Sequence, residues 1–196
     1  MKRSRDLPYC GGMTSVAASD ALDTKFHSLL NDQVRSELGA SQQYLAIAVY
    51  FDSDDLPQLA EFFYRQSVEE RNHAMMLVRY LVDRGVRTEI PAVDPVRNSF
   101  ETPREAIAFA LDLEREVTDQ ISRLAATARD EGDYLGEQFM QWFLKEQVEE
   151  VAQMTTLVRI ADRAGANLFH LEDFVARELA APSADPSAPK AAGGAL

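Results

Sequence analysis

The segment LAEFFYRQSVEERNHAMMLVRYL, residues 59–81, carries apolar side chains at intervals of three and four residues. This spacing predicts an amphipathic helix with one buried face. Glu70 and His73 interrupt that face near its middle, and their i, i+3 spacing puts both on the same side of the helix. An E-x-x-H pair alone is weak evidence for metal binding, because a single histidine on an apolar face is more often a core residue.

Helical periodicity covers most of the chain. We expect helices at about residues 24–51, 56–84, 103–130, 134–162 and 167–179. The joints after the first and third helices are short, which favours antiparallel pairing of the first helix with the second and of the third with the fourth. The acidic run of residues 52–55 offers caps for the second helix. Residues 86–102 contain Pro91 and Pro95 and no convincing period, and their length suits a connection that crosses the bundle. The chain is therefore predicted to be all-α, a four-helix bundle with a long crossover and a short fifth C-terminal helix.

Each long helix carries carboxylates on its predicted inward face, close to its midpoint. These acids are Glu37, Glu70, Glu114, and Glu146 with Glu150, and Gln147 lies beside the last two. Antiparallel packing brings the midpoints level, so the acids should meet in the core, where like charges repel and unpaired carboxylates are costly to bury. Any one of them could lie at the edge of the core instead, but four coincidences at one level are hard to assign to errors in helix boundaries. Bound cations would remove the cost, and oxygen ligands with one imidazole suit iron, manganese or zinc.

Composition indicates a single folded domain. The chain has 196 residues, 46% of them hydrophobic, and a formal net charge of -12 that argues against nucleic-acid partners. Cys10 is the only cysteine, no apolar stretch follows the basic N-terminus, and no apolar run approaches the roughly 20 residues of a membrane helix. We therefore expect a cytoplasmic protein with no membrane partner.

The chain is expected to have a flexible arm over residues 1–22, a folded domain over 23–179 and a flexible tail over 180–196. Met13, within the arm, could be the true start of the protein.

Three stretches resemble a known family: QQY at residues 42–44, VEERNHA at 68–74 and FMQWFLKEQ at 139–147. Over about residues 22–179 the chain is similar to the bacterial non-haem ferritins, and especially to their actinobacterial members. The resemblance implies a ferritin-like di-iron domain and a homo-oligomeric, hollow 24-subunit shell that stores iron. It also implies ferroxidase activity, in which O2 or H2O2 oxidises Fe(II) to Fe(III) at a dinuclear centre and the product is stored as a ferric mineral.

The resemblance, carried over residue by residue, implies three iron positions. The ligands of the first iron would be Glu37, Glu70 and His73. Those of the second would be Glu70, which bridges, Glu114 and Gln147. The third position matches Glu69, Glu146, Glu149 and Glu150, of which Glu150 could be shared. Tyr44 matches a tyrosine that hydrogen-bonds the centre and could give an electron, although an ordinary core aromatic is an equal alternative.

The fourth helix departs from the pattern of related di-iron proteins. Its sequence QVEE, residues 147–150, offers no second histidine, whereas bacterioferritins and ribonucleotide-reductase-like enzymes keep both. A glutamine is a weaker, neutral ligand from which oxidised iron can leave. Arg71 stands where a bacterioferritin offers its haem-binding methionine, so we expect no haem.

One alternative function is that of a rubrerythrin-like di-iron peroxidase or oxidase without mineral storage. It lacks support because the sequence contains no C-x-x-C pair. The other is an interaction bundle without metal chemistry.

The remaining histidines and one acidic cluster receive weaker interpretations. His27 and His170 are expected at the surface or at an interface, without a ligand role. Four acids near the joint between the third and fourth helices are candidates for guiding Fe(II) through a channel, with helix capping and solvation as the alternative. They are Asp130, Glu131, Asp133 and Glu137.

Overall fold

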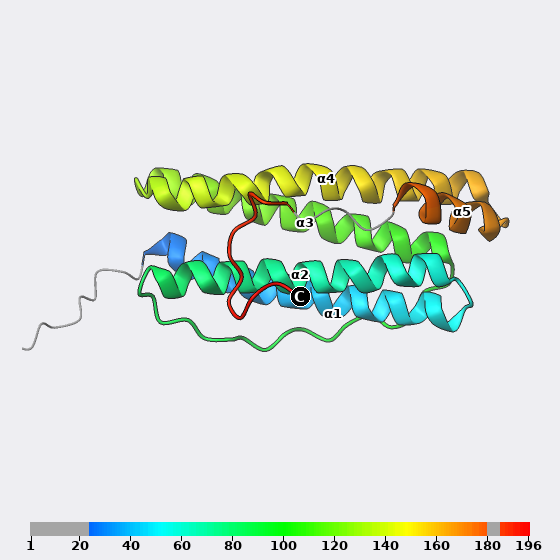
Figure 1. Cartoon of the computed structure of the whole chain (residues 1–196), viewed down its shortest axis with the longest axis horizontal. Coiled ribbons are helices and arrows are strands. Elements are labelled where there is room, and N and C mark those ends of the chain that lie inside the picture. Colours follow the sequence, from blue (N-terminus) through cyan, green and yellow to red (C-terminus); the bar gives the residue numbers. More distant parts are fainter. Residues whose placement is uncertain (1–23, 180–184) are drawn as a thin grey trace, which may run out of the picture.

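The computed structural model describes residues 24–179 and 185–196, and these residues form helices and no strand. The helices are α1 (Lys25–Ser53), α2 (Pro57–Asp83), α3 (Pro103–Asp130), α4 (Tyr134–Ala164) and α5 (Leu168–Glu178). α1 packs against α2 and α3 against α4, and the two pairs lie side by side (Figure 1). The connection from α2 to α3 runs along the outside of the α1/α2 pair (Figure 1). The predicted four-helix bundle with a long crossover and a short fifth helix is confirmed.

The N-terminal arm expected over residues 1–22 lies outside the described residues, as does Cys10. None of the helices that the described residues form combines the length and the apolar character needed to cross a membrane.

Side chains cap some of the helices, either from the preceding residue or from another part of the fold. Thr24 begins α1 by accepting a hydrogen bond from the backbone N–H of His27. The prediction that the acidic run caps α2 is wrong, because α1 continues to Ser53 and the N-cap of α2 is Leu56, which makes no side-chain cap. Glu172 of α5 takes that role, since its carboxylate accepts from the N–H groups of the first turn of α2 at 2.9 Å each. The short fifth helix therefore helps to fix where α2 begins.

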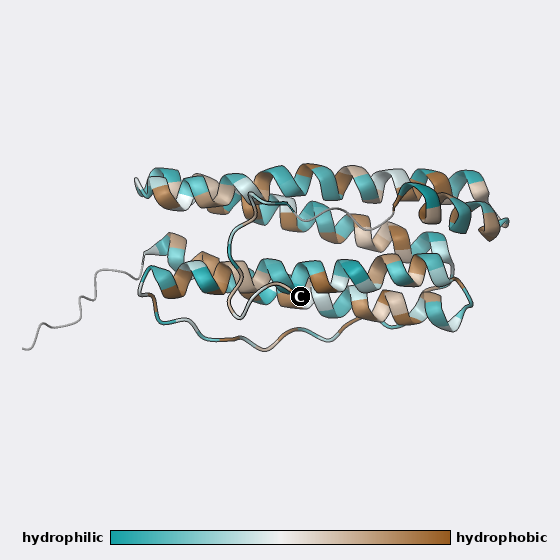
Figure 2. Ribbon diagram, viewed as in Figure 1, coloured by the Kyte–Doolittle hydropathy of each residue, from teal (hydrophilic) through white to brown (hydrophobic). Residues whose placement is uncertain are grey.

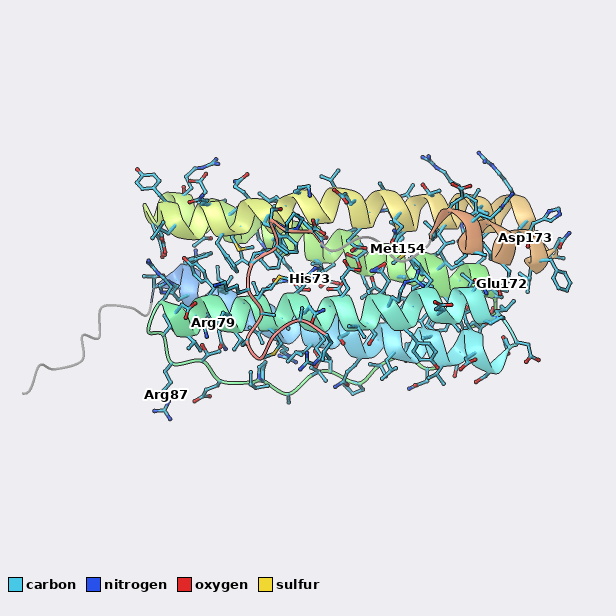
Figure 3. The ribbon with its side chains drawn as sticks, viewed as in Figure 1. His73, Arg79, Arg87, Met154, Glu172 and Asp173 are labelled. Atoms are coloured by element: carbon cyan, nitrogen blue, oxygen red, sulfur yellow. The ribbon has the colours of Figure 1, made fainter. Side chains whose placement is uncertain are left out.

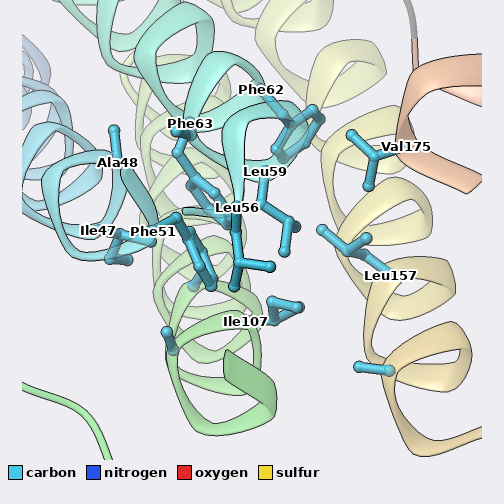
Figure 4. Packing of buried hydrophobic residues seen from close by; sticks show 14 of the residues in the cluster. Ile47, Ala48, Phe51, Leu56, Leu59, Phe62, Phe63, Ile107, Leu157 and Val175 are labelled. Carbon is cyan, nitrogen blue, oxygen red and sulfur yellow. The ribbon is translucent and has the colours of Figure 1, made fainter. Parts of the chain in front are cut away.

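The hydrophobic core has two parts. One lies at the α5 end of the bundle and includes Phe51, Phe63 and Leu157 (Figure 4). The other lies toward the opposite end and includes Leu77 and Ile121. Figure 2 shows hydrophilic and hydrophobic residues alternating along each long helix. Full burial of such a side chain contributes about 1.5–3 kcal/mol, so the two clusters can offset a costly polar layer between them.

The crossover is tied to the bundle through one buried amide. Gln43 on α1 donates from Nε2 to the backbone oxygen of Arg97 and accepts from its N–H, each at 2.8 Å. The Arg97 guanidinium lies 4.5 Å from the ring centroid of Phe100. These contacts hold the long connection in place without any secondary structure of its own.

The described part of the C-terminal tail has a definite path over α2 and α4. Trp142 donates from Nε1 to the Asp185 carboxylate at 3.1 Å, and the N–H of Ala192 bonds to a backbone carbonyl of α2 at 2.9 Å. Flexibility of the tail over 180–196 stays a prediction. Residues 185–196 nevertheless lie against the face of the bundle from which the site described below is reached.

Candidate metal centre

A layer of buried polar side chains crosses the bundle between the two core clusters. Each long helix contributes a carboxylate that is 1–6% exposed, namely Glu37 from α1, Glu70 from α2, Glu114 from α3 and Glu150 from α4. His73 and Gln147 are buried in the same layer. Figure 3 shows His73 near the middle of the bundle, between α2 and the α3/α4 pair. The structure thus brings to one level four of the five carboxylates that periodicity predicted to face inward, whereas the fifth, Glu146, is only partly buried.

The α1/α2 half of the layer forms one compact group. One potential ligand atom from each of Glu37, Glu70 and His73 lies within 4.8 Å of the others. His73 Nδ1 is 3.2 Å from Glu70 Oε2. Gln33, one turn before Glu37 and also buried, donates from Nε2 to Glu37 Oε1 at 3.0 Å. Because that bond occupies one oxygen of Glu37, the other is left to face Glu70 and His73.

The α3/α4 half is organised by hydroxyl groups. The Tyr44 hydroxyl donates to Glu114 Oε1, and Gln147 Nε2 lies 3.5 Å from the other oxygen of the same carboxylate. Thr118 Oγ lies 2.8 Å from Gln147 Oε1 and 2.7 Å from the Glu114 backbone carbonyl, either of which can accept its proton. Tyr44 therefore has the hydrogen bond to the centre that the resemblance implied. Gln147 directs its amide nitrogen, rather than its carbonyl oxygen, at Glu114.

Several buried carboxylate oxygens lack a hydrogen-bond partner. They are Glu37 Oε2, Glu70 Oε1 and Glu150 Oε2. A buried acceptor without a donor costs about 1–3 kcal/mol, and more when it is charged. Cations of high charge with oxygen and imidazole ligands, such as iron, satisfy such oxygens and cancel their repulsion. The donor set and its unpartnered oxygens could therefore hold a metal ion.

The pKa values of these carboxyls reflect the same burial and mutual repulsion. Burial, and after it the neighbouring Glu70 carboxylate, raise the pKa of the Glu37 carboxyl from 4.5 to about 8. Burial raises the pKa of Glu114 to about 7, although the hydrogen bond from Tyr44 opposes the rise. The pKa values of Glu70 and Glu150 are also raised, first by burial and then by neighbouring carboxylates. An incoming cation must therefore displace protons from this layer at neutral pH.

A second group lies beside the first, nearer the solvent. One potential ligand atom from each of Glu69, His73 and Glu146 lies within 4.8 Å of the others. Gln66 donates from Nε2 to Glu69 Oε2 at 3.0 Å. Of the four residues expected at the third iron position, Glu69 and Glu146 are thus brought together, and His73 joins them. Glu150 lies in the buried layer and lines the same cavity as Glu69 and Glu146, so its sharing between the two groups stays a prediction.

Glu149 is not part of either group. Its side chain is 66% exposed, and its carboxylate lies 3.7 Å from Lys145 Nζ. The helical period explains this position, because Glu149 lies about 100° around α4 from Glu150 and so points away from the core.

A cavity of about 740 Å³ lies beside both groups. Its lining includes Glu69, His73, Glu146, Glu149 and Glu150, and part of its wall comes from the tail residues Asp185, Ala188, Ala195 and Leu196.

Three supporting residues received no role from the sequence. Gln33, Gln66 and Thr118 each hydrogen-bond the side chain of a site residue. Gln33 and Gln66 lie on the inward apolar stripes of their helices, so the sequence indicated that both side chains are buried. It did not indicate which side chains they contact. Thr118 follows Glu114 by one turn and meets Gln147 of another helix, a contact that no local pattern reveals.

The expectation that His27 lies at the surface is wrong. Its side chain is 1% exposed in the single chain, and Nε2 lies 3.7 Å from Asp133 Oδ2. His170 is exposed, as expected.

Three of the four acids at the α3/α4 joint make contacts at the helix ends. Asp133 accepts from the Gly136 N–H at the start of α4, and Glu131 accepts from the first two N–H groups of α1. Glu137 pairs with Arg129. These contacts favour the capping interpretation of the cluster over guidance of Fe(II).

Sequence comparison connects the chain with one family. A family model described as a ferritin-like domain matches residues 27–164. The protein named Ferritin BfrB from Mycolicibacterium smegmatis is 75% identical over 178 residues, which covers 91% of this chain and 98% of that protein. The protein named bacterial non-heme ferritin from Staphylococcus aureus is 36% identical over 152 residues, which covers 76% of this chain and 92% of that protein.

Structural comparison leads to the same group. A crystal structure described as an open pore ferritin from the hyperthermophilic archaeon Archaeoglobus fulgidus matches with a TM-score of 0.76 at 29% identity. The match covers 80% of this chain and 96% of that chain.

Proposed function

Because the chain belongs to the ferritin family and is an iron-storage protein, we propose that it oxidises Fe(II) in the buried carboxylate layer and keeps the Fe(III) as a mineral inside a shell. The proposal makes the protein a ferroxidase with O2 or H2O2 as the oxidant. The observation that carries it is the meeting of four buried carboxylates, one from each long helix, with unpartnered oxygens among them.

Two Fe(II) ions would occupy the layer as substrates. Glu37, Glu70 and His73 bind the first, and Glu70, Glu114 and Gln147 bind the second. The carbonyl oxygen of Gln147 faces Thr118, and a turn of the amide would bring that oxygen toward the second ion. Tyr44 holds one oxygen of Glu114 and thereby leaves the other to the metal.

The residues of the layer favour oxidation through their charge. Burial has raised the pKa values of these carboxyls, so they carry protons before iron arrives. Binding of Fe(II) displaces these protons and leaves anionic ligands around the ions. Each Fe(II) supplies one electron, and the two together reduce O2 to H2O2, or H2O2 to water. Carboxylates bind Fe(III) more strongly than Fe(II) because the added charge strengthens each ionic contact. The neutral, weaker ligand Gln147 lets the oxidised ion leave for the mineral.

Assembly into an oligomeric shell agrees with the exposed apolar side chains of the single chain. Tyr134 is 76% exposed, Val148 71% and Phe169 83%, and burial between subunits would remove this apolar surface from water. We propose 24 subunits and a cytoplasmic location, as the family implies. No haem is proposed, since Arg71 occupies the position that the haem ligand would need.

A double substitution tests the site. Glu37→Ala with Glu70→Ala should reduce rapid Fe(II) oxidation, followed by stopped-flow absorbance, to the background rate of Fe(II) in buffer, while size-exclusion chromatography still shows the shell. The matched control is Glu61→Ala with Glu116→Ala, which removes two exposed carboxylates from α2 and α3 and should leave the rate unchanged. Unchanged rapid oxidation in the Glu37/Glu70 variant would show that the site is elsewhere.

The rubrerythrin-like alternative is not favoured. Such an enzyme would keep its two irons after turnover and form no mineral. Aerobic addition of Fe(II) in large excess over the subunits, followed by size-exclusion chromatography, separates the two functions, because iron that elutes with the shell beyond a few ions per subunit means storage.

A further inference from the structure

The side-chain amide of Gln147 is held in the buried layer by contacts with α3. Gln147 is 4% exposed, and within residues 24–179 and 185–196 its amide has two hydrogen-bond partners, Thr118 and Glu114. Oε1 lies 2.8 Å from the Thr118 hydroxyl, a normal length for a bond donated by an O–H, whereas Nε2 lies 3.5 Å from Glu114 Oε2, which is long for a hydrogen bond. The Thr118 hydroxyl is therefore the closer contact that restrains the amide.

Position and chemistry allow this hydroxyl to serve either orientation of the amide. Its oxygen also lies 2.7 Å from the backbone carbonyl of Glu114, one turn earlier in α3. A hydroxyl has one proton to donate and two lone pairs with which to accept. Thr118 can donate to Gln147 Oε1, as in the structure. If the amide turned, Nε2 would donate to the hydroxyl oxygen, and the hydroxyl proton would go to the Glu114 carbonyl.

We propose that Thr118 is a positioning residue for Gln147, because its hydroxyl accepts a hydrogen bond from Nε2 while Oε1 binds the second ion. The inference rests on the proposed function for the role of Gln147 as a ligand. It deepens that function by naming the side chain that keeps this neutral ligand in place. Thr118 itself contacts no ion.

Loss of the hydroxyl should weaken binding of the second ion. A glutamine side chain that loses a partner can rotate toward another one as long as no ion holds it, which limits the cost of the loss. An ion bound to Oε1 fixes the amide, so Nε2 would remain buried without an acceptor, and such a donor is costly. The penalty therefore falls mainly on the bound state. The first ion does not use Gln147 and should be little affected.

Calorimetric titration of the chelated full-length protein with Zn(II) tests this role without redox chemistry. Gln147→Leu removes the amide and so identifies the binding step that belongs to the second position. Thr118→Val replaces the hydroxyl with a methyl group of similar size and should weaken that step at least fivefold. Thr118→Ala should weaken it equally, whereas Thr118→Ser keeps the hydroxyl and should bind like the wild type.

A second threonine of the same helix separates this role from a general effect on α3. Thr127 makes the same type of bond to the carbonyl one turn earlier, from Oγ to Arg123 at 2.8 Å, but it lies further along α3 from Gln147. Thr127→Val should therefore leave every Zn(II) step unchanged. Adding Thr118→Val to Gln147→Leu should also have no further effect, since the amide that the hydroxyl positions is then absent.

Three results would overturn the proposal. They are a weakening of less than fivefold in Thr118→Val, an equal weakening when Thr118→Val is added to Gln147→Leu, and a Gln147→Leu variant in which no Zn(II) step changes. Failure of the proposed function is a separate outcome. If these variants bind Zn(II) as expected but the wild type oxidises Fe(II) no faster than buffer does, the ferroxidase proposal fails and the role of Thr118 stands. If the wild type oxidises Fe(II) rapidly and Thr118→Val binds Zn(II) unchanged, only the role of Thr118 fails.

Discussion

Replacing Glu37 with glutamine should stabilise the metal-free protein and weaken its metal centre at the same time. Burial raises the pKa of this carboxyl from 4.5 to about 8. A group whose pKa is raised on folding contributes stability that is fully present below pH 4.5 and is lost as the pH rises through about 8. Glutamine has nearly the same shape and cannot ionise in either state. The variant should therefore escape this loss.

The structure sets the size of the effect. The interval from 4.5 to about 8, at about 1.4 kcal/mol per pH unit, corresponds to about 5 kcal/mol for a fully buried group. The advantage of Glu37→Gln should be near zero at pH 4.5, grow by about 1.4 kcal/mol per pH unit, and level off above pH 8. Gln33 can still donate to the side-chain oxygen of the new residue, so the local hydrogen bond survives.

Urea denaturation followed by circular dichroism, in chelator at several values between pH 5 and pH 9, measures this advantage. Glu116→Gln, at an exposed position of α3, is the matched control and should follow the wild type at each pH. With Fe(II) or Zn(II) present the order should reverse, because the wild type then gains binding energy that the variant lacks. Parallel stability curves for the wild type and Glu37→Gln across this range in chelator would refute the reasoning.

Three other substitutions test particular contacts. Gly136→Ala should cost about 1–3 kcal/mol, because an added Cβ would lie 2.5 Å from the buried Phe26 ring, whereas Gly39→Ala meets nothing within 4 Å and should stabilise α1 by about 0.5–1 kcal/mol. Melting temperatures that shift in the same direction would contradict this pair. Glu172→Ala should cost about 0.5–2 kcal/mol and speed hydrogen exchange in the first turn of α2, but not in α1. Tyr44→Phe removes the donor to a buried carboxylate and should cost about 1–3 kcal/mol in chelator, measured by urea denaturation, and an unchanged stability would argue that the bond is unimportant.

Secondary structure and the polar layer could be predicted from the sequence because both depend on local periodicity. Each predicted helix boundary lies within two residues of the observed one. A carboxylate on an apolar stripe must face inward once the helix forms, and short joints make the midpoints of neighbouring helices level. Glu37, Glu70, His73 and Glu114 could be found in this way without knowledge of any contact. The length of the crossover likewise predicted that it spans the bundle.

Only the tertiary structure decided which side chains meet. Glu172 caps a helix that begins 115 residues earlier in the chain, Thr118 meets Gln147 of the next helix, and the buried His27 lies beside Asp133 at the start of α4. Periodicity specifies the face of a helix on which a residue lies, but neither its rotamer nor its partner on another helix. The sequence could therefore determine that a charged layer exists inside the bundle. The packing of one helix against another determined that His73, and not Glu149, lies with Glu69 and Glu146.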